Sequence, residues 1–359
     1  MLAELTKERP MSGLYEESLR RVECPCCDGC SSVLWMRVPG QPPSSTDFEL
    51  IRCTSCSHTW ISNPPDPEQL SRYYSPEYHQ AVEHSGVNDK KRWGRQLNIL
   101  SLYKAKGDIL DIGCSAGGFL TYLKDGPWKL YGIEASADTA EKARAATGGD
   151  IFAGDVLKAD FAPQSFDVIT CSDVLEHLYE PREVFRIVHQ WLKPGGIFYV
   201  FVPNIMSWEA RAFRSRWYGL DPPRHLHHYS ILSLKALSSS ADLAMVRVVT
   251  PEGCYLEQSI SLLMNDVLAK AGVTHPNINL SGPAWIGWRV VRKVIRISVE
   301  ALYSRIASHC GSAPSIQAVF MKPIVPRPQP KNDFNVPLPI QKEVSAVDEN
   351  HASIGCVAR

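Results

Sequence analysis

The sequence lacks a net charge, a long apolar run and an apolar leader, and each absence argues against a class of protein. Its 38 Lys and Arg residues balance 38 Asp and Glu residues, so no overall basic field favours nucleic acid. The first thirty residues hold no apolar stretch of signal-peptide length. No uninterrupted apolar run reaches the roughly 18–20 residues that span a bilayer. We therefore expect a cytoplasmic protein.

Cysteine is not scarce, but it is unevenly placed. Six of the 11 cysteines fall between Cys24 and Cys56, and the others are scattered singly. Because no secretion signal is recognisable, such a cluster favours metal binding over disulfides. Two C-x-x-C pairs, Cys24 with Cys27 and Cys53 with Cys56, stand about 25 residues apart. Each pair can present two thiolates from a tight turn, which is what tetrahedral zinc requires.

The register of the metal ligands has alternatives. Cys27 and Cys30 also form a C-x-x-C, and Cys26 or His58 could replace one ligand. We predict that the ligands are the four cysteines of the two pairs named above. Four protein ligands leave no open coordination position, so the zinc site is expected to be structural. Unrelated buried thiols are the alternative interpretation.

Residues 108–120, DILDIGCSAGGFL, form the stretch around which the chain is organised. A short apolar run ends in a turn of small residues, and an apolar helix start follows at Phe119. This order of buried strand, glycine-rich turn and helix is typical of the first unit of a doubly wound α/β sheet. Asp111 ends the strand, where ligands bind in such sheets.

The spacing of the small residues differs from the dinucleotide fingerprint G-x-G-x-x-G. The residues Asp111, Gly113, Ser115 and Gly117 instead match D-x-G-x-G-x-G, with serine at the middle glycine. The stretch therefore resembles motif I of the class I S-adenosylmethionine-dependent methyltransferases. The cysteine knuckles, the Pro-rich NPPDP and the L-x-x-Y-Y that precede it are similar to small-molecule methyltransferases with an N-terminal zinc ribbon. Many of those act on sugars or other biosynthetic intermediates.

Strand and helix patterns alternate regularly after this motif. Strands are predicted at 108–112 and 129–134, within DIFAGDV at 150–156, within FDVITCSDVLEHL at 166–178 (a strand and its loop), at 197–204, at MVRVVTPEG (245–253) and at 316–323. Helices are predicted at 136–147, 181–192 and 230–241, and the KPGG run at 193–196 is interpreted as a turn. We expect an α/β fold: a Rossmann-like, seven-stranded methyltransferase sheet flanked by helices, with a small N-terminal zinc ribbon and a helical insertion.

The predicted organisation has six parts. They are a flexible lead-in at 1–20, a zinc-binding module at 21–65, a helical linker at 66–107, a methyltransferase domain at 108–250 and 314–323, a helical insertion at 251–313 and a disordered tail at 324–359.

The resemblance implies how S-adenosylmethionine would be bound. Glu134, 23 positions after Asp111, would accept hydrogen bonds from the ribose diol, although a solvated strand-end acid is the alternative. Asp155, with the Val156 backbone, stands where the family contacts the adenine amino group, but Asp is also common in turns. The residues expected at the methionine end or beside the cofactor are Asp111, Gly113, Ser115, Gly117, Ser172 and Asp173.

Methyl transfer is an in-line displacement at a carbon activated by the sulfonium, so the protein contributes mainly positioning. An alcohol acceptor must also lose a proton, which histidine can remove at neutral pH. His225 is the first candidate for base or acceptor contact, because its loop, P-x-H-L-x-x-Y-S, resembles the acceptor-side loop of related methyltransferases. His177, in DVLEHL, is the second candidate, with a structural histidine as its alternative.

The end of the His225 loop has two further interpretations. Metal binding by His227 and His228 is disfavoured, because adjacent side chains point in different directions. Ser230 as a helix N-cap is the simpler role.

The insertion is expected to hold a basic amphipathic helix at 285–306. Its cations are Arg289, Arg292, Lys293 and Arg296. Such a helix is typical of peripheral contact with an anionic membrane surface, and equally of a lid over an acidic substrate; ordinary packing is favoured over both. If the functional role holds, a lipid-linked or phosphorylated sugar would suit it.

We expect an S-adenosylmethionine-dependent methyltransferase that acts on a small molecule. Two other classes compete with this function. An RNA methyltransferase with a zinc module is disfavoured by the zero net charge. A non-catalytic binding protein on the cofactor fold is disfavoured by the intact set of Asp111, Glu134 and Asp155.

Overall fold

The computed structural model describes residues 19–20, 22–27, 29, 31–40, 46–74, 90–270 and 300–324, all within one compact unit. Its larger sheet has seven strands in the order β11-β12-β9-β8-β5-β6-β7. These strands are β5 (Gly107–Ile112), β6 (Trp128–Glu134), β7 (Asp150–Ala153), β8 (Phe166–Ser172), β9 (Leu192–Pro203), β11 (Ala244–Val249) and β12 (Ser315–Met321). β12 lies antiparallel between β9 and β11, whereas β5 to β9 pair in parallel.

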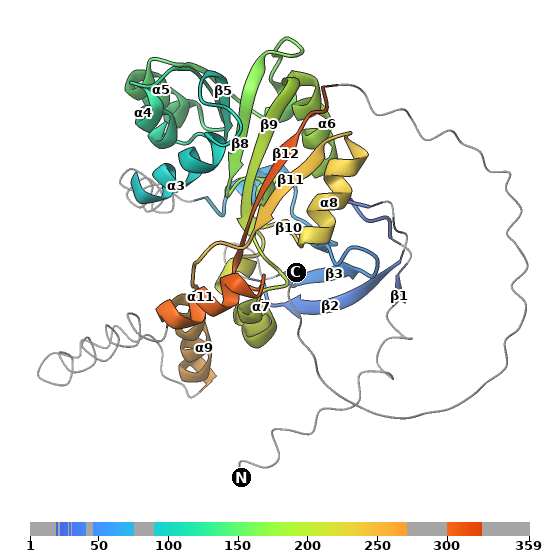
Figure 1. The fold of residues 1–359 in the computed structure, drawn as a ribbon. Helices are drawn as coiled ribbons and strands as arrows, with labels where there is room; N and C mark the ends of the chain where they lie inside the picture. The colour runs from blue at the N-terminus through green and yellow to red at the C-terminus, as the bar shows by residue number, and fades with distance from the viewer. Residues whose placement is uncertain are drawn as a thin grey trace, which may run out of the picture. The chain divides into compact units, whose positions relative to one another are not determined.

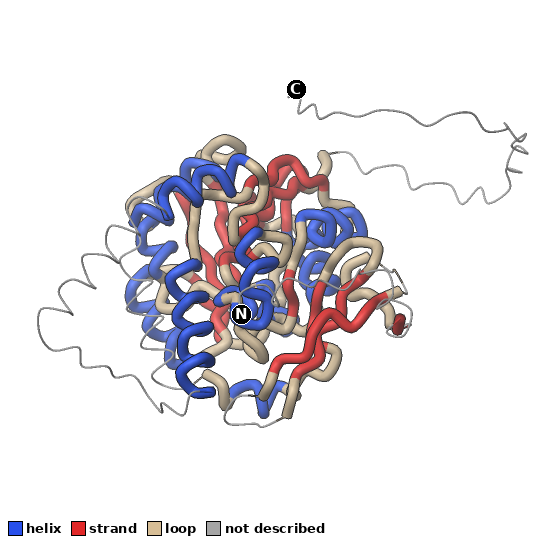
Figure 2. The backbone as a smooth tube through the Cα atoms, turned by 90° about the horizontal axis from the view of Figure 1, so that it is seen from below, coloured by secondary structure: helices blue, strands red, loops and turns tan. Residues whose placement is uncertain are grey.

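Helices cover both faces of this sheet, as Figures 1 and 2 show. The helices α3 (Lys90–Leu100), α4 (Gly118–Leu123) and α5 (Ala137–Thr147) lie on one face, and α6 (Pro181–Trp191) and α8 (Ile231–Ser240) on the other. Successive strand residues point to opposite faces, so Ile109 joins the α4–α5 core and Leu110 joins the α6–α8 core. The predicted α/β architecture and its seven-stranded sheet are confirmed.

Helix α6 shows how the local sequence sets one of these layers. Pro181 opens the helix, where its missing N–H is not needed. Val184, Phe185, Val188 and Trp191 recur at helical spacing and are all buried. Each fully buried large apolar side chain contributes about 1.5–3 kcal/mol, so this face holds the helix on the sheet.

The KPGG run, predicted as a turn, is part of β9 but forms a bulge: between the pairs Phe166–Leu192 and Val168–Ile197, its four residues oppose one residue of β8. β9 begins at Leu192 and continues through the run, with Gly195 at φ 73° as an irregular position. The Gly195 N–H donates to the Lys322 carbonyl at 2.9 Å, which continues the pairing with the end of β12. Lys193 Nζ lies 2.8 Å from Asp108 Oδ2 and 2.6 Å from Asp167 Oδ2. These long-range contacts hold the bulged segment in the sheet.

A smaller sheet combines N-terminal strands with one from the centre of the chain. Its order is β1 (Leu19–Arg20), β2 (Ser32–Val38), β3 (Phe48–Cys53), β4 (Thr59–Ile61) and β10 (His227–His228). β10 pairs antiparallel with β4, so that His227 faces Trp60 and His228 faces Thr59. The N-terminal strands are thus joined directly to the loop that carries His225.

The smaller sheet is packed on both sides. Ile51 and Trp60 belong to the same core as α6 and α8, whereas Leu50 and Ile61 pack with Trp217. The cysteine-containing segment therefore shares its core with the larger sheet.

The remaining helices are short or lie in the insertion. They are α1 (Pro67–Ser71), α7 (Trp208–Phe213), α9 (Leu256–Lys270) and α11 (Ala301–His309), with 3-10 turns η2 (Val156–Lys158), η3 (Leu175–His177), η4 (Arg214–Arg216) and η5 (Tyr218–Leu220). Most of the predicted 285–306 helix, including its four cations, lies outside the described residues, as do the predicted lead-in up to residue 18 and the tail beyond 324. Among the helices that are described, none is both long and apolar enough to cross a membrane.

Candidate functional site

The glycine-rich turn between β5 and α4 has positive φ angles and close neighbours that favour small residues. Gly113 has φ 73°, and a Cβ there would lie 2.3 Å from Val174 Cγ2. Gly117 has φ 79°, and a Cβ there would lie 2.7 Å from Thr147 Cγ2. Ser115, at the middle position, also has a positive φ of 49°. Serine therefore takes up the conformation for which glycine is favoured, and the turn is preserved.

This turn borders a cavity of about 220 Å³ at the carboxyl end of β5. The cavity is lined by the turn, by the end of β8 and by α3, through residues that include Asp111, Gly113, Ser115, Ser172, Asp173, Arg92, Trp93 and Gln96. Five residues of the predicted cofactor set are thus gathered on one cavity. Its position outside the carboxyl ends of parallel strands is where ligands bind in open α/β sheets.

Asp111 is the buried acid of this cavity. Its Oδ1 accepts a 2.6 Å hydrogen bond from Thr170 Oγ1, which stands beside it in register on β8. Burial raises the pKa of Asp111 to about 7, although the Thr170 hydrogen bond and the Arg92 charge oppose the rise. A bound cation would therefore stabilise the ionised form.

Two buried polar atoms in the cavity wall are available to form hydrogen bonds with a ligand. Gln96 Nε2 and Ser172 Oγ are buried and have no hydrogen-bond partner within the described part of the chain. Such orphaned groups cost free energy unless a ligand or water satisfies them. Together with Asp111, they give the cavity a donor, a hydroxyl and a carboxylate, which fit a zwitterionic amino-acid moiety such as that of S-adenosylmethionine.

Glu134 stands at the end of β6, next to the same turn. Its Oε2 accepts a 3.1 Å hydrogen bond from the Ser115 N–H, and its Oε1 accepts one of 2.9 Å from the Ser136 N–H. These bonds fix the orientation of the carboxylate, whose further lone pairs can accept from a ligand diol.

Asp155 lies at the end of β7 and caps η2. Its Oδ1 accepts a 2.8 Å hydrogen bond from the Leu157 N–H, and the side chain is exposed beside the buried Val156. The turn-capping role weighed from the sequence is thus present, and it still leaves Oδ2 available to a ligand.

Sequence reasoning missed the contribution of α3. Arg92 of this helix forms an ion pair with Asp173, whose φ is 54°, and lies over the Phe201 ring at 4.9 Å. Arg92 and Gln96 stand four residues apart and both line the cavity. That i,i+4 spacing of polar residues on an amphipathic helix was the available signal.

His177 and His225 lie together, in a cluster beside η3. Their ring centroids are 4.8 Å apart, and with Glu176 they bring two imidazoles and a carboxylate within 4.8 Å of one another. Tyr74 Oη lies 3.1 Å from His177 Nδ1. Neither histidine belongs to the residues that line the 220 Å³ cavity.

The hydrogen bonds of the two histidines determine where their lone pairs lie. His225 Nδ1 is 3.0 Å from the Gly219 carbonyl, and His177 Nδ1 is 2.8 Å from the Arg224 carbonyl. Because a carbonyl can only accept, each Nδ1 carries the proton and each Nε2 the lone pair. Burial lowers the pKa of both rings, that of His225 well below its usual range. Both are therefore neutral bases near pH 7.

His227 and His228 contribute to the smaller sheet. His228 Nε2 donates to the Leu220 carbonyl at 2.7 Å, and His227 Nε2 to the Tyr179 carbonyl at 3.3 Å. His58 Nε2 then donates to His227 Nδ1 at 3.0 Å. Ser230 caps α8, with its Oγ also 2.7 Å from the Cys56 carbonyl. The end of this loop is thus an attachment point for the N-terminal segment.

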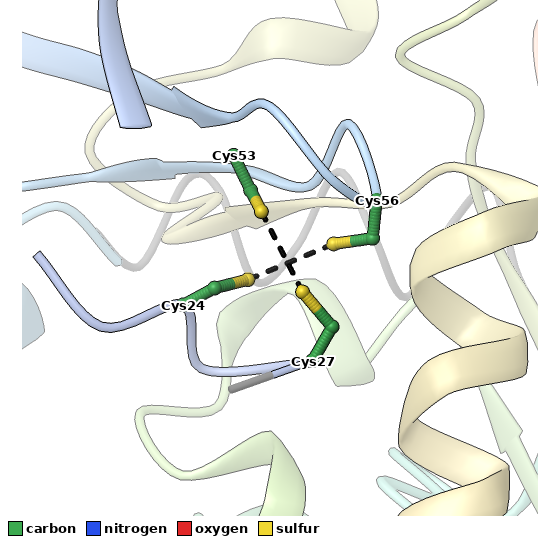
Figure 3. A group of neighbouring side chains, drawn as sticks. All are labelled: Cys24, Cys27, Cys53 and Cys56. Atoms are coloured by element: carbon green, nitrogen blue, oxygen red, sulfur yellow. Dashed lines mark hydrogen bonds between the residues drawn. The ribbon is translucent and has the colours of Figure 1, made fainter. Parts of the chain in front are cut away.

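The four cysteines of the two C-x-x-C pairs converge (Figure 3). Cys24 Sγ lies 3.6 Å from Cys56 Sγ, and Cys27 Sγ lies 3.5 Å from Cys53 Sγ. A tetrahedral ion with Zn–S bonds of about 2.3 Å needs sulfur atoms roughly 3.8 Å apart. The observed spacing fits such an ion.

The backbone around the cluster also suits metal-bound thiolates. The Cys26 N–H donates to Cys24 Sγ and the Ser55 N–H to Cys53 Sγ, each at 3.4 Å. Cys26 is buried in the core and lies outside the group of four, and His58 is engaged with His227. Cys30, the other alternative ligand, lies outside the described residues.

Comparison with known proteins finds similarity to methyltransferases. The sequence model of the methyltransferase domain family matches residues 87–248. The ubiquinone biosynthesis O-methyltransferase of Idiomarina loihiensis is 31% identical over 159 residues, which are 40% of this chain and 64% of that protein. Phosphoethanolamine N-methyltransferase 3 of Arabidopsis thaliana is 30% identical over 121 residues, 32% of this chain and 24% of that protein.

The likeness is partial in both length and shape. The chain spans less than two thirds of the length of either curated relative. A solved structure of phosphoethanolamine N-methyltransferase 2 of Haemonchus contortus, in complex with S-adenosyl-L-methionine, has a TM-score of 0.46 and 14% identity, covering 80% of this chain and 71% of that one. The family match coincides with α3 and the strands and turns that build the 220 Å³ cavity. Residues 87–248 of this chain are therefore similar to the methyltransferase domain family.

Proposed function

We propose that the protein is an S-adenosylmethionine-dependent methyltransferase whose acceptor is a small molecule, such as a saccharide or another biosynthetic intermediate. The observation that carries this proposal is the cavity at the end of β5. It combines the glycine-rich turn, the buried Asp111 and two orphaned polar atoms on Gln96 and Ser172. S-adenosylmethionine, when bound, supplies a methyl group activated by its sulfonium.

Different residues of the chain bind different parts of S-adenosylmethionine. Asp111 and the Gly113 turn hold the methionine end, where the carboxylate of Asp111 faces a cationic group. Glu134, fixed by the Ser115 and Ser136 N–H groups, accepts from the ribose hydroxyls. Asp155 and the Val156 backbone bind the adenine edge. Positioning of this kind is worth effective molarities of about 10⁵ M or more.

His225 is the proposed base. Its Nδ1–H is anchored on the Gly219 carbonyl, which leaves Nε2 to accept the acceptor's proton. Asp221 Oδ2 lies 4.0 Å from Nε2, so the imidazolium that forms is stabilised by a nearby carboxylate. Asp221 is itself held by two hydrogen bonds from Arg224, at 2.9 and 2.6 Å. His177, packed edge-on against His225, is the second candidate.

We further propose that Cys24, Cys27, Cys53 and Cys56 bind one structural zinc ion. The spacing of the four sulfur atoms and the two N–H···S bonds support this. The ion would stabilise the smaller sheet and, through β10, the loop that presents His225. Its role is therefore in folding and positioning, and no chemical step passes through it.

The function is tested by transfer of a labelled methyl group from S-adenosylmethionine into a cell extract separated into RNA, protein, lipid and small polar molecules. Label in the small polar or lipid fraction is expected. Label in RNA would instead support the RNA methyltransferase that the zero net charge disfavours. Failure of the purified chain to bind S-adenosylmethionine would identify it as a non-catalytic protein on this fold.

A further inference from the structure

A second cavity, of about 420 Å³, adjoins the first. It lies between α3, the carboxyl half of β9, the start of β12 and the segment just before α9. Arg92 and Asp173 line both cavities, so their ion pair stands at the boundary between the two. A molecule in the second cavity would therefore lie directly beside one in the first.

The floor of the second cavity is polar and preorganised. Gln317 Nε2 donates to Tyr199 Oη at 2.6 Å, and both side chains are buried. Tyr255 Oη lies 3.3 Å from Ser315 Oγ. The apolar part of the wall comes from Ile99, Phe201, Pro251 and Pro314. A compact molecule with both polar and apolar surface fits such a lining.

The formal charges that line the cavity cancel, with Arg92 and Arg95 against Asp173 and Glu252, but the ion pairs are unevenly distributed. Arg92 pairs with Asp173, and Glu252 Oε1 lies 3.9 Å from Arg305 Nε. Each of the two acids thus has a cationic partner. Arg95, one turn of α3 after Arg92, has no ion-pair partner among the described residues. The Arg95 guanidinium is therefore the lining cation that remains outside these ion pairs.

The charge of Arg95 reaches the polar floor. Burial raises the pKa of Tyr199 to about 12, and the charges of Arg92 and Arg95 both oppose that rise. Arg95 is therefore electrostatically coupled to the Tyr199 hydroxyl, as expected if the two side chains line the same space.

We propose that the second cavity binds the methyl acceptor, and that Arg95 selects an acceptor carrying an anionic group, a carboxylate or a phosphate. This inference rests on the proposed methyltransferase function. An exposed guanidinium at the cavity margin offers paired N–H donors that match the oxygen atoms of either anion. With the anion at Arg95, the rest of the acceptor extends across the Tyr199 floor toward the Arg92–Asp173 boundary and the cofactor cavity. Neither His225 nor His177 lines the second cavity, so this placement of the acceptor is independent of the histidine proposed as base.

The test begins with the full chain and labelled S-adenosylmethionine. Small molecules from the extract are passed over a strong anion exchanger, and the retained and unretained pools are offered separately as acceptors. The inference predicts label in the retained pool, and label confined to the unretained pool would overturn it. Treatment of the labelled product with a phosphatase and a phosphodiesterase together separates the two sources of charge: loss of retention identifies a phosphate ester, and unchanged retention indicates a carboxylate.

Arg95→Glu provides the matched variant. We expect transfer to fall about tenfold or more, while S-adenosylmethionine binds as in the wild type, because Arg95 does not line the first cavity. Arg247→Glu makes the same charge change on the exposed surface of β11 and should leave transfer unchanged. Equal transfer by the wild type and Arg95→Glu would overturn the inference alone. Absence of S-adenosylmethionine binding by the wild type would overturn the proposed function, and the inference with it.

Discussion

His58 donates a 3.0 Å hydrogen bond to His227 across 169 residues of sequence, and this bond joins the cysteine-containing segment to the loop of the proposed base. Both rings are buried, and they stack with centroids 5.2 Å apart. His227 lies two residues after His225 and pairs with Trp60 on β4. The position of His225 is therefore coupled to the N-terminal segment.

Replacement of His58 by alanine should destabilise the whole unit. The change leaves His227 Nδ1 buried without its donor and opens a cavity among stacked rings, so we expect a loss of about 1–3 kcal/mol in the free energy of unfolding. Urea unfolding measures it. His309→Ala on α11, where the side chain is exposed, is the control. Equal midpoints for the two variants would contradict a structural role for His58.

Loss of the metal should lower turnover although the metal takes no part in the chemistry. Purified protein should contain one zinc per chain by elemental analysis, and Cys56→Ser should remove it and weaken the attachment of Ser230, whose Oγ lies 2.7 Å from the Cys56 carbonyl. Cys310→Ser, at an exposed thiol, should retain both metal and activity. A metal-free wild type after expression with ample zinc would refute the proposed site.

Gly113→Ala should impair the cofactor turn far more than Gly148→Ala. Both glycines have a left-handed φ, 73° and 68°, so alanine costs each about 1–2 kcal/mol. At Gly113 the added Cβ would also lie 2.3 Å from Val174 Cγ2, whereas nothing lies within 4 Å at Gly148. We expect weaker S-adenosylmethionine binding for Gly113→Ala alone, measured by calorimetry. Similar affinities in the two variants would show that the turn does not contact the cofactor.

His225→Ala should lower turnover by about 10²- to 10⁴-fold while cofactor affinity changes little. Because burial holds the pKa of His225 well below its usual range, the imidazole of the free enzyme stays neutral from pH 6 to 8. The pH profile of kcat/KM for the acceptor, measured at saturating S-adenosylmethionine so that the ionisation of Asp111 does not contribute, should therefore lack a histidine inflection near 6.5. Equal losses of turnover and cofactor affinity would instead indicate that the loop is structural.

Much of the fold could be predicted from local patterns. The strands of the larger sheet are short apolar runs bounded by turn residues. Helix α6 is indicated by Pro181 at its start and by apolar residues at helical spacing. The KPGG sequence predicts a turn, but its inclusion in β9 as a bulge depends on pairing with Lys322 and on the salt bridges of Lys193 to Asp108 and Asp167. Local propensity carries no information on such contacts.

The candidate site was only partly predictable for the same reason. Motif spacing brings Asp111, Gly113 and Ser115 to one turn, because neighbours in sequence share it. Gln96 comes from α3, which precedes the larger sheet in the chain, and its i,i+4 spacing from Arg92 does not by itself show that the two residues line a cavity. β10 is two residues long, and its partner β4 lies more than 160 residues earlier, so its pairing could not be recognised from periodicity.

Asp111 gives the cofactor site a distinctive dependence on pH. Its pKa is raised to about 7 in the folded protein, from a usual value near 3.8, chiefly by burial. The folded state therefore binds this proton more tightly, and the ionised form costs stability as the pH rises from about 4 to 7. Binding of a cationic cofactor stabilises the ionised carboxylate of Asp111 and so offsets this loss of stability. At pH 6 only about a tenth of Asp111 is ionised, so affinity should be about tenfold lower than at pH 8.

Calorimetric titration of S-adenosylmethionine into the wild type, Asp111→Asn and Glu134→Ala, at pH 6 and pH 8, shows whether this cavity binds the cofactor. We expect saturable binding of one molecule per chain, weakened in both variants, with the tenfold dependence on pH lost in Asp111→Asn. Absence of binding to the wild type, or unchanged affinity in both variants, would contradict the assignment of this cavity to S-adenosylmethionine.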